Sequence, residues 1–174
     1  LIGGENIVVK NCQLGAQPTG ITCKVQEVNK LSFINNQVYP DGRENLVLDA
    51  CDNCVIEGNN FKSYYNGILV LNGNDNTVNK NIFWLTGAVQ NQLLDHGDDF
   101  GIINVKGNNN MVASNSLSCE WAYAGAVTVN AVQGTGNVFK NCFVDNLESY
   151  RVFLVNAQTE VSNCVSSDKV SIVE

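Results

Sequence analysis

In VIEGNNFKSYYNGILVLNGNDNTVNKNIFW, which runs from Val55 to Trp84, one short pattern occurs twice. It consists of an apolar residue, two variable residues, an Asn, one variable residue and a second apolar residue, as in Ile56–Phe61 and Val78–Phe83. Further copies lie at Phe33–Val38, Val112–Leu117 and Val138–Phe143, with weaker ones around Asn11 and Asn163. Self-similarity at a nearly fixed period is the signature of a repeat protein.

The Asn of the pattern marks each repeat, and the markers recur at a short, nearly constant spacing that only the interval from Asn81 to Asn115 clearly exceeds. An inward Asn at a turn can pair its amide with the backbone of the next repeat. We therefore expect one structural ladder formed by Asn11, Asn36, Asn59, Asn81, Asn115, Asn141 and Asn163.

A second short run of β-branched and apolar residues, bounded by Gly and Asn, lies between successive markers. These runs have the composition of strands. They are Gly20–Cys23, Asn45–Asp49, Gly67–Leu71, Gly101–Val105, Gly125–Val129 and Arg151–Val155. With 27 Asn and 15 Gly the chain turns often, which disfavours long helices.

A short repeat that cannot bury its own apolar face must stack on its neighbours. The sequence therefore predicts an all-β fold, a right-handed parallel β-helix (solenoid) of about seven coils, because parallel crossovers are right-handed. A leucine-rich repeat has a similar period, but Leu is too sparse here for its consensus. We expect a single β-helix domain over residues 1–174, a piece of a longer β-helix, because the chain begins without Met inside a patterned segment.

The net charge is −7, and the ten Lys and Arg are scattered singly. This distribution argues against nucleic acid and against an anionic membrane surface as partners. No apolar run approaches the roughly 20 residues of a membrane span, and no signal segment is recognised.

The long interval between Asn81 and Asn115 adds about ten residues to one repeat, at Leu85–Asp99, and contains the sole His of the sequence. Long loops on a rigid scaffold often carry function. Asp95, His96, Asp98 and Asp99 are our candidate substrate-binding residues, because carboxylates and an imidazole suit sugar hydroxyls or acid and base chemistry. Two alternatives stay open: the residues only turn the chain, or they are oxygen ligands of a cation.

Cys51 and Cys54 form a CxxC motif, but no second pair and no suitably spaced His accompany it. We therefore predict no metal site and no cofactor. Cys12, Cys142 and Cys164 each follow a marker Asn and are expected to stack on different coils as small apolar side chains. Seven Cys is an odd number, so a complete disulfide framework is excluded.

Aromatic residues cluster at or just beyond the marker strands: Tyr64, Tyr65, Trp84, Trp121, Tyr123 and Tyr150. If the coils are in register, these side chains lie along one edge. Such an edge suits the stacking of sugar rings and equally suits a subunit interface. We place Tyr64, Trp84 and Trp121 in or near an interface of an oligomer.

The stretches Ala50–Phe83 and Asp98–Leu117 resemble the inulin fructotransferases and difructose anhydride hydrolases of glycoside hydrolase family ninety-one. The shared features are the CxxC motif, the strand after Asn66-Gly67, the long loop ending in an acidic pair, and the following GNNN. The likeness covers most of the chain and weakens after about Asn130.

The resemblance implies a homotrimer of right-handed β-helices and a carbohydrate partner, a fructan such as inulin or a difructose anhydride. It implies a lyase-type transfer or a glycosidase hydrolysis that uses two carboxylates. In that family the catalytic carboxylates lie on coils before the one that opens here at Leu1, so the catalytic residues are unknown and none is assigned.

Two hypotheses follow. The chain is part of a fructan-active enzyme, or it is a non-catalytic β-helix of the tailspike or adhesin kind that binds glycan or self-assembles. Ice binding is a third reading, but the seven Thr form no column. Chemistry on an external polymer favours a bacterial protein that is secreted or held at the cell surface. The alternative stays open, because seven Cys without an even disulfide framework fit a reducing interior, where a difructose anhydride could also be hydrolysed.

Overall fold

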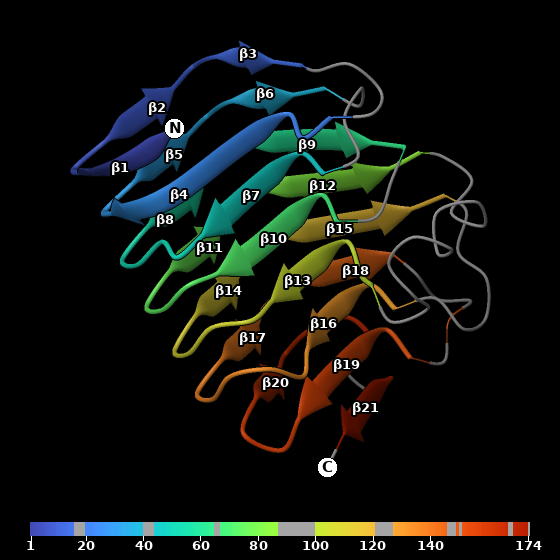
Figure 1. Ribbon diagram of the computed structural model, residues 1–174. Helices are drawn as coiled ribbons and strands as arrows, with labels where there is room; N and C mark the ends of the chain where they lie inside the picture. Colours follow the sequence, from blue (N-terminus) through green and yellow to red (C-terminus); the bar gives the residue numbers. More distant parts are fainter. Residues whose placement is uncertain are drawn as a thin grey trace.

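The computed structural model describes residues 1–15, 20–39, 44–64, 67–86, 100–120, 127–145, 149, 151–166 and 169–173. Within these ranges the chain forms strands and turns and no helix. It winds through three parallel sheets that Figure 1 shows as stacked coils, with the two termini at opposite ends of the stack. Among these residues, accordingly, no helix is long and apolar enough to cross a membrane.

Each coil contributes its strands to the sheets in the same sequence. Sheet A contains β1 (Ile2–Glu5), β4 (Cys23–Asn29), β7 (Leu46–Asp49), β10 (Leu69–Asn72), β13 (Ile103–Val105), β16 (Val129–Ala131), β19 (Phe153–Asn156) and β21 (Val170–Val173). Sheet B contains β2 (Val8–Lys10), β5 (Ser32–Ile34), β8 (Val55–Glu57), β11 (Thr77–Asn79), β14 (Met111–Ala113), β17 (Val138–Lys140) and β20 (Glu160–Ser162). Sheet C contains β3 (Gln13–Leu14), β6 (Gln37–Val38), β9 (Asn60–Ser63), β12 (Ile82–Leu85), β15 (Ser116–Cys119) and β18 (Phe143–Asp145).

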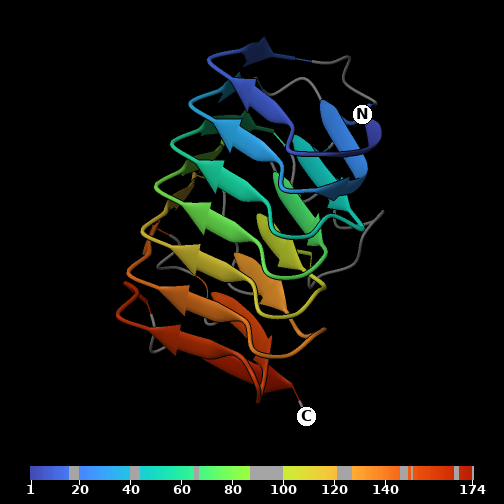
Figure 2. The same ribbon diagram turned by 90° about the vertical axis from the view of Figure 1, so that its left-hand side faces the viewer.

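The right-handed parallel β-helix expected from the repeat is confirmed. Figure 2, turned by 90°, shows the strands of successive coils lying in line. Sheet C has six strands in the described residues, so the coils that contribute to all three sheets are slightly fewer than the roughly seven expected.

The sheet A strands begin later than the sequence pattern suggested. The run Gly20–Cys23 was expected as a strand, but β4 starts only at Cys23. Likewise β10 starts at Leu69, two residues after Gly67, which has a positive φ of 77°. Gly67 therefore belongs to the corner, where its left-handed backbone turns the chain into the sheet.

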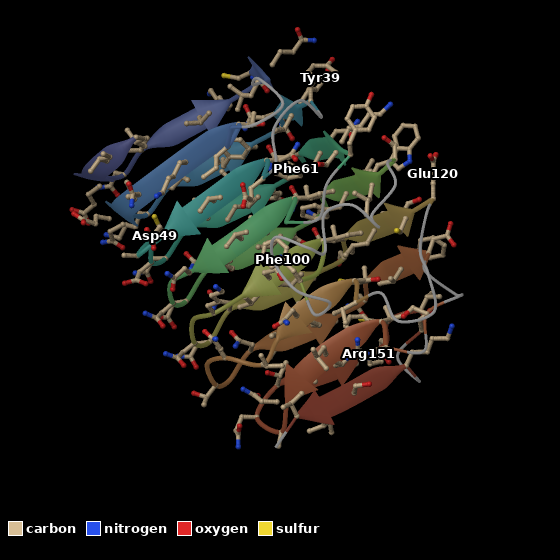
Figure 3. All side chains as sticks on the ribbon, turned by 45° about the vertical axis from the view of Figure 1, so that its right-hand side comes forward. Tyr39, Asp49, Phe61, Phe100, Glu120 and Arg151 are labelled. Carbon is tan, nitrogen blue, oxygen red and sulfur yellow. The ribbon has the colours of Figure 1, made fainter. Side chains whose placement is uncertain are left out.

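The core fills the space between the three sheets. Strand alternation sends Leu46 and Leu48 inward, where they are fully buried, and leaves Val47 half-buried on the outside. Phe33, Phe61 and Phe83 come from successive coils of this core, and their rings stack with centroids 6.3 and 5.0 Å apart. Figure 3 labels Phe61, which lies on β9.

Buried Asn side chains form a column at the corner between sheets B and C. The Oδ1 atom of Asn59 accepts the backbone N–H and the side-chain amide of Asn36, at 2.8 and 3.0 Å. Asn81 accepts the same two bonds from Asn59, and Asn115 accepts them from Asn81. Each amide also donates to a carbonyl, as Asn81 does to Ile56 O at 2.9 Å. The four side chains are at most 1% exposed.

The other three expected members, Asn11, Asn141 and Asn163, do not belong to this column. All three are exposed and have φ between 52° and 56°, in the left-handed region. The column position is the following residue, a Cys in each coil: the N–H of Cys12 donates to Asn36 Oδ1 at 2.9 Å. The N–H of Cys142 likewise points to Cys164 Sγ at 3.4 Å.

A second inner column lies five residues earlier in each coil, between sheets A and B. Its members are Asn76, Asn110 and Asn137, all about 1% exposed. Asn76 donates from its backbone and its amide to Asn110 Oδ1, both at 3.0 Å, and Asn110 does the same to Asn137. Two of the three corners of the coil are thus closed by paired amides, which satisfy backbone groups that a turn leaves open.

Candidate functional site on the outer face of sheet C

The loop residues singled out from the sequence, Asp95, His96, Asp98 and Asp99, lie outside the described residues, and so does Trp121. The interval that contains the four loop residues, 87–99, begins three residues after Trp84 in the sequence. The described part of the site is therefore the outer face of sheet C, which leads into that interval.

One row of outward-facing side chains crosses sheet C. In each coil its member lies three residues after the column position between sheets B and C, the position of Asn59 and Asn81. Strand register pairs Trp84 of β12 with Lys62 of β9 on one side and with Ser118 of β15 on the other. Ser118 pairs in turn with Asp145 of β18. Tyr39, 41% exposed, follows Val38, which pairs with Phe61, and so continues the row beyond Lys62.

The Trp84 side chain is 37% exposed and is held from two directions. Its Nε1–H donates to Glu120 Oε1 at 3.1 Å. The Lys62 ammonium lies over the indole, 4.2 Å from the ring centroid. A cation over the ring face and a charged acceptor on the N–H both favour one orientation of the indole.

Other side chains on this face extend the surface around the indole. Ile82 and Phe143 project outward in the neighbouring row and are 50% and 54% exposed. Tyr64 follows β9, is 46% exposed, and falls in the same register row as Glu120. Figure 3 labels Tyr39 and Glu120, which both project from this side of the molecule. The surface therefore combines aromatic rings with carboxylates and one ammonium.

The expected aromatic edge is present in part. Tyr64 and Trp84 lie on the outer face of sheet C, whereas Tyr65, Tyr123 and Tyr150, like Trp121, are outside the described residues. The sequence reading overlooked Lys62, Ser118, Glu120 and Asp145. Counting three residues onward from each column position would have aligned Lys62, Trp84, Ser118 and Asp145. For Asp145 this count works only if the column position is Cys142 and not the expected Asn141.

The CxxC motif belongs to the core. Cys51 and Cys54 are fully buried, and their thiols point to carbonyl oxygens, Cys51 Sγ to Val25 O at 3.4 Å and Cys54 Sγ to Asp52 O at 3.3 Å. Burial raises the pKa of both thiols above the usual value, which keeps them protonated and poorly nucleophilic. In the described part of the chain, no three His, Cys, Asp or Glu side chains are grouped so as to hold a metal ion.

Cys142 and Cys164 are neighbours in the inner column of successive coils. Because the Cys142 thiol donates to Cys164 Sγ, the pKa of Cys164 is lowered to about 7, and that of Cys142 is raised. Both residues are buried, so this pair closes the C-terminal end of the column and is not part of the outer face.

Several solved structures resemble this fold. The structure of DFA-IIIase from Arthrobacter chlorophenolicus A6 in complex with GF2 matches with a TM-score of 0.82 and 21% identity. The match covers 99% of this chain and 46% of that one. The same enzyme in complex with DFA-III gives 0.77 at 21% identity, covering 99% and 48%, and the enzyme without its lid gives 0.79 at 22%, covering 98% and 45%. At these identities the likeness concerns the fold, and the chain spans less than half the length of these structures.

No curated protein matches the sequence. The model of the family described as "Right handed beta helix region" matches residues 19–172, which is most of the chain. The stacked coils, the three parallel sheets and the inner Asn columns agree with that match. The chain belongs to the right-handed β-helix family.

Proposed function

We propose that this chain is the carbohydrate-contacting part of a fructan-active β-helix protein, and that the outer face of sheet C around Trp84 contacts the sugar. The observation that carries the proposal is the partly exposed indole, oriented by Glu120 at 3.1 Å and by Lys62 at 4.2 Å. Sugar C–H faces stack on aromatic rings, and neighbouring carboxylates accept hydrogen bonds from hydroxyls.

The comparisons favour fructans over other glycans. The similar structures contain GF2 or DFA-III bound to DFA-IIIase. A short fructan or a difructose anhydride is therefore the first ligand to test on this chain, in agreement with the resemblance to glycoside hydrolase family ninety-one. Asp95, His96, Asp98 and Asp99 follow Trp84 closely in sequence, and we assign them to the same substrate-binding region.

No residue of this chain is assigned a catalytic role. The chain corresponds to less than half of the matched DFA-IIIase chains. Transfer that forms a difructose anhydride, or hydrolysis that opens one, is proposed for a longer protein of which this chain is a part. A bacterial protein acting on an external polymer would be secreted or held at the cell surface.

Binding is tested by isothermal titration of the chain with GF2, with DFA-III and, as an unrelated sugar, with maltotriose. We expect GF2 or DFA-III to bind and maltotriose not to bind. Trp84→Ala should weaken binding at least tenfold, whereas Ile82→Ala, which removes an exposed apolar side chain of the same face, should change it less than threefold. Absence of binding to both fructan ligands contradicts the proposal.

A second function is favoured by the exposed apolar side chains of the same face. Ile82 and Phe143, each about half exposed, lie on the same outer face of sheet C as Tyr64 and Trp84, and such a surface also suits a subunit interface. We propose a homotrimer with Tyr64, Trp84 and Trp121 in or near the contact. Light scattering at about 100 μM decides this, because an interface worth about 6 kcal/mol is then substantially occupied. A monodisperse monomer contradicts the trimer.

A further inference from the structure

We infer that one neutral sugar ring stacks on the face of the Trp84 indole that is turned toward β15, above Ser118, and that Asp145 accepts hydrogen bonds from its hydroxyls. The inference rests on the proposed function and specifies it. It assigns the side of the ring, the width of the subsite and the charge of the ligand.

The two faces of the indole are not equivalent. Lys62, the register partner on β9, places its ammonium 4.2 Å from the ring centroid. A sugar ring stacks at about 4 Å, the contact distance of carbon atoms, so the ammonium occupies the space that a sugar would need. The face turned toward β15 is the one on which a ligand can stack.

Ser118 provides the room on that side. It is the register partner of Trp84 on β15, it is half-buried, and its side chain is the smallest in the row. The next member, Asp145 on β18, is exposed. Neighbouring strands are about 4.8 Å apart, so the Trp84 and Asp145 positions are separated by roughly 10 Å.

That width fits one sugar ring. A ring stacked at about 4 Å from the indole, with a hydroxyl on its far side, leaves roughly the distance that an O–H···O bond to the Asp145 carboxylate requires. Two stacked rings would exceed the available width. The subsite is therefore one sugar unit thick, with Ser118 as its floor.

The charges select a neutral ligand. Asp145 and Glu120 flank the subsite, and ionised carboxylates accept hydrogen bonds but cannot donate them. The Lys62 ammonium lies over the face of the indole away from the proposed subsite. A hydroxyl-rich neutral sugar can satisfy both acceptors, whereas a uronate would place a third negative charge between them.

The test uses two serines of one strand. Ser116 and Ser118 are both half-buried on the outside of β15, but Ser116 lies in the neighbouring row between Ile82 and Phe143. Ser118→Leu fills the proposed subsite and should weaken GF2 or DFA-III binding at least thirtyfold. Ser116→Leu and a digalacturonate titration are the controls: the variant should change binding less than threefold, and digalacturonate should not bind.

The results separate this inference from the proposed function. If the wild-type chain binds neither GF2 nor DFA-III, the proposed function fails and the inference fails with it. If the wild type binds but Ser118→Leu binds equally well, or Ser116→Leu loses as much as Ser118→Leu, only the assignment of the ring face is overturned. Circular dichroism of both serine variants verifies that they fold, and Asp145→Ala, an exposed site, supplies an independent measurement with an expected loss of about tenfold.

Discussion

Two sets of side chains lie three residues apart in each coil and face different environments. Asn36, Asn59, Asn81 and Asn115 repeat one residue type in a sealed column in which the amides are paired from coil to coil. The outer row, three residues further along each of the same four coils, changes from Tyr to Lys, Trp and Ser. The interior repeats the same hydrogen bonds through these four coils, whereas the exterior is free to vary and can therefore carry recognition.

The largest effect is expected at the centre of the column. Asn81→Ala removes the oxygen that accepts from the backbone N–H of Asn59 and the amide that donates to Ile56 O, so two buried backbone groups lose these partners. An unpaired buried polar group costs about 1 to 3 kcal/mol, so the free energy of unfolding should fall by about 4 kcal/mol in urea titrations.

The matched control is Asn60→Ala. Asn60 directly follows the column residue Asn59 in the chain, and its side chain is exposed. Its effect should stay within about 0.5 kcal/mol, as for most surface substitutions. Equal losses for the two variants would contradict the distinction between column and outer face.

A smaller effect is expected in the aromatic stack. Phe61 lies between Phe33 and Phe83 and is fully buried, so Phe61→Leu loses ring contacts and leaves a small void. We expect unfolding to become easier by about 1 to 2 kcal/mol. Phe143 lies on the outer face and is 54% exposed, so Phe143→Leu should lower the free energy of unfolding by less than half as much as Phe61→Leu.

A third prediction extends the column. Cys142 occupies the column position after Asn115, whose backbone and side chain hydrogen-bond to the Cys142 sulfur, and sulfur is a weak acceptor compared with an amide oxygen. Cys142→Asn should therefore raise the free energy of unfolding by about 1 kcal/mol, while Cys142→Ala should lower it. Thermal unfolding of the two variants side by side is sufficient, and a destabilised Cys142→Asn would show that the column cannot be lengthened at this coil.

The smallest effects are expected in the outer row. Lys62→Met and Glu120→Gln each remove one charge beside Trp84, on a partly exposed surface where water screens the interaction. Stability should change by less than about 0.5 kcal/mol in either case. If chemical denaturation showed a loss of unfolding free energy as large as that expected for Phe61→Leu, the outer row would support the fold, contrary to the comparison above.

The fold could be predicted from the sequence because stacked coils must place apolar residues and turn residues at the same positions in every coil. That requirement leaves a visible repeat in the sequence. The ladder position was predictable where the flanking apolar residues are unambiguous, as in Ile56–Phe61. Around Asn141 they are not: Val138 and Phe139 are both apolar, so the pattern fits in two registers. The structure pairs Phe139 with Val112, which shifts the column from Asn141 to Cys142.

The outer site was less predictable. Trp84 stood out as an aromatic residue near a long loop, but Lys62, Ser118 and Asp145 are ordinary surface residues in the sequence. They become neighbours only because parallel strand pairing joins one coil to the next, and a one-residue error in register would move each to the other face of the sheet.

The column also makes each coil an exchangeable module. Asn59 receives from Asn36 the same two bonds that Asn81 receives from Asn59, so the coils that carry the column Asn make the same contacts with the coil before and the coil after. A gene that duplicates or loses one whole coil leaves each surviving amide with a partner. Lineages of such proteins can therefore change length in steps of one coil, moving an outer-face side chain nearer to or farther from its neighbours without redesigning the interior.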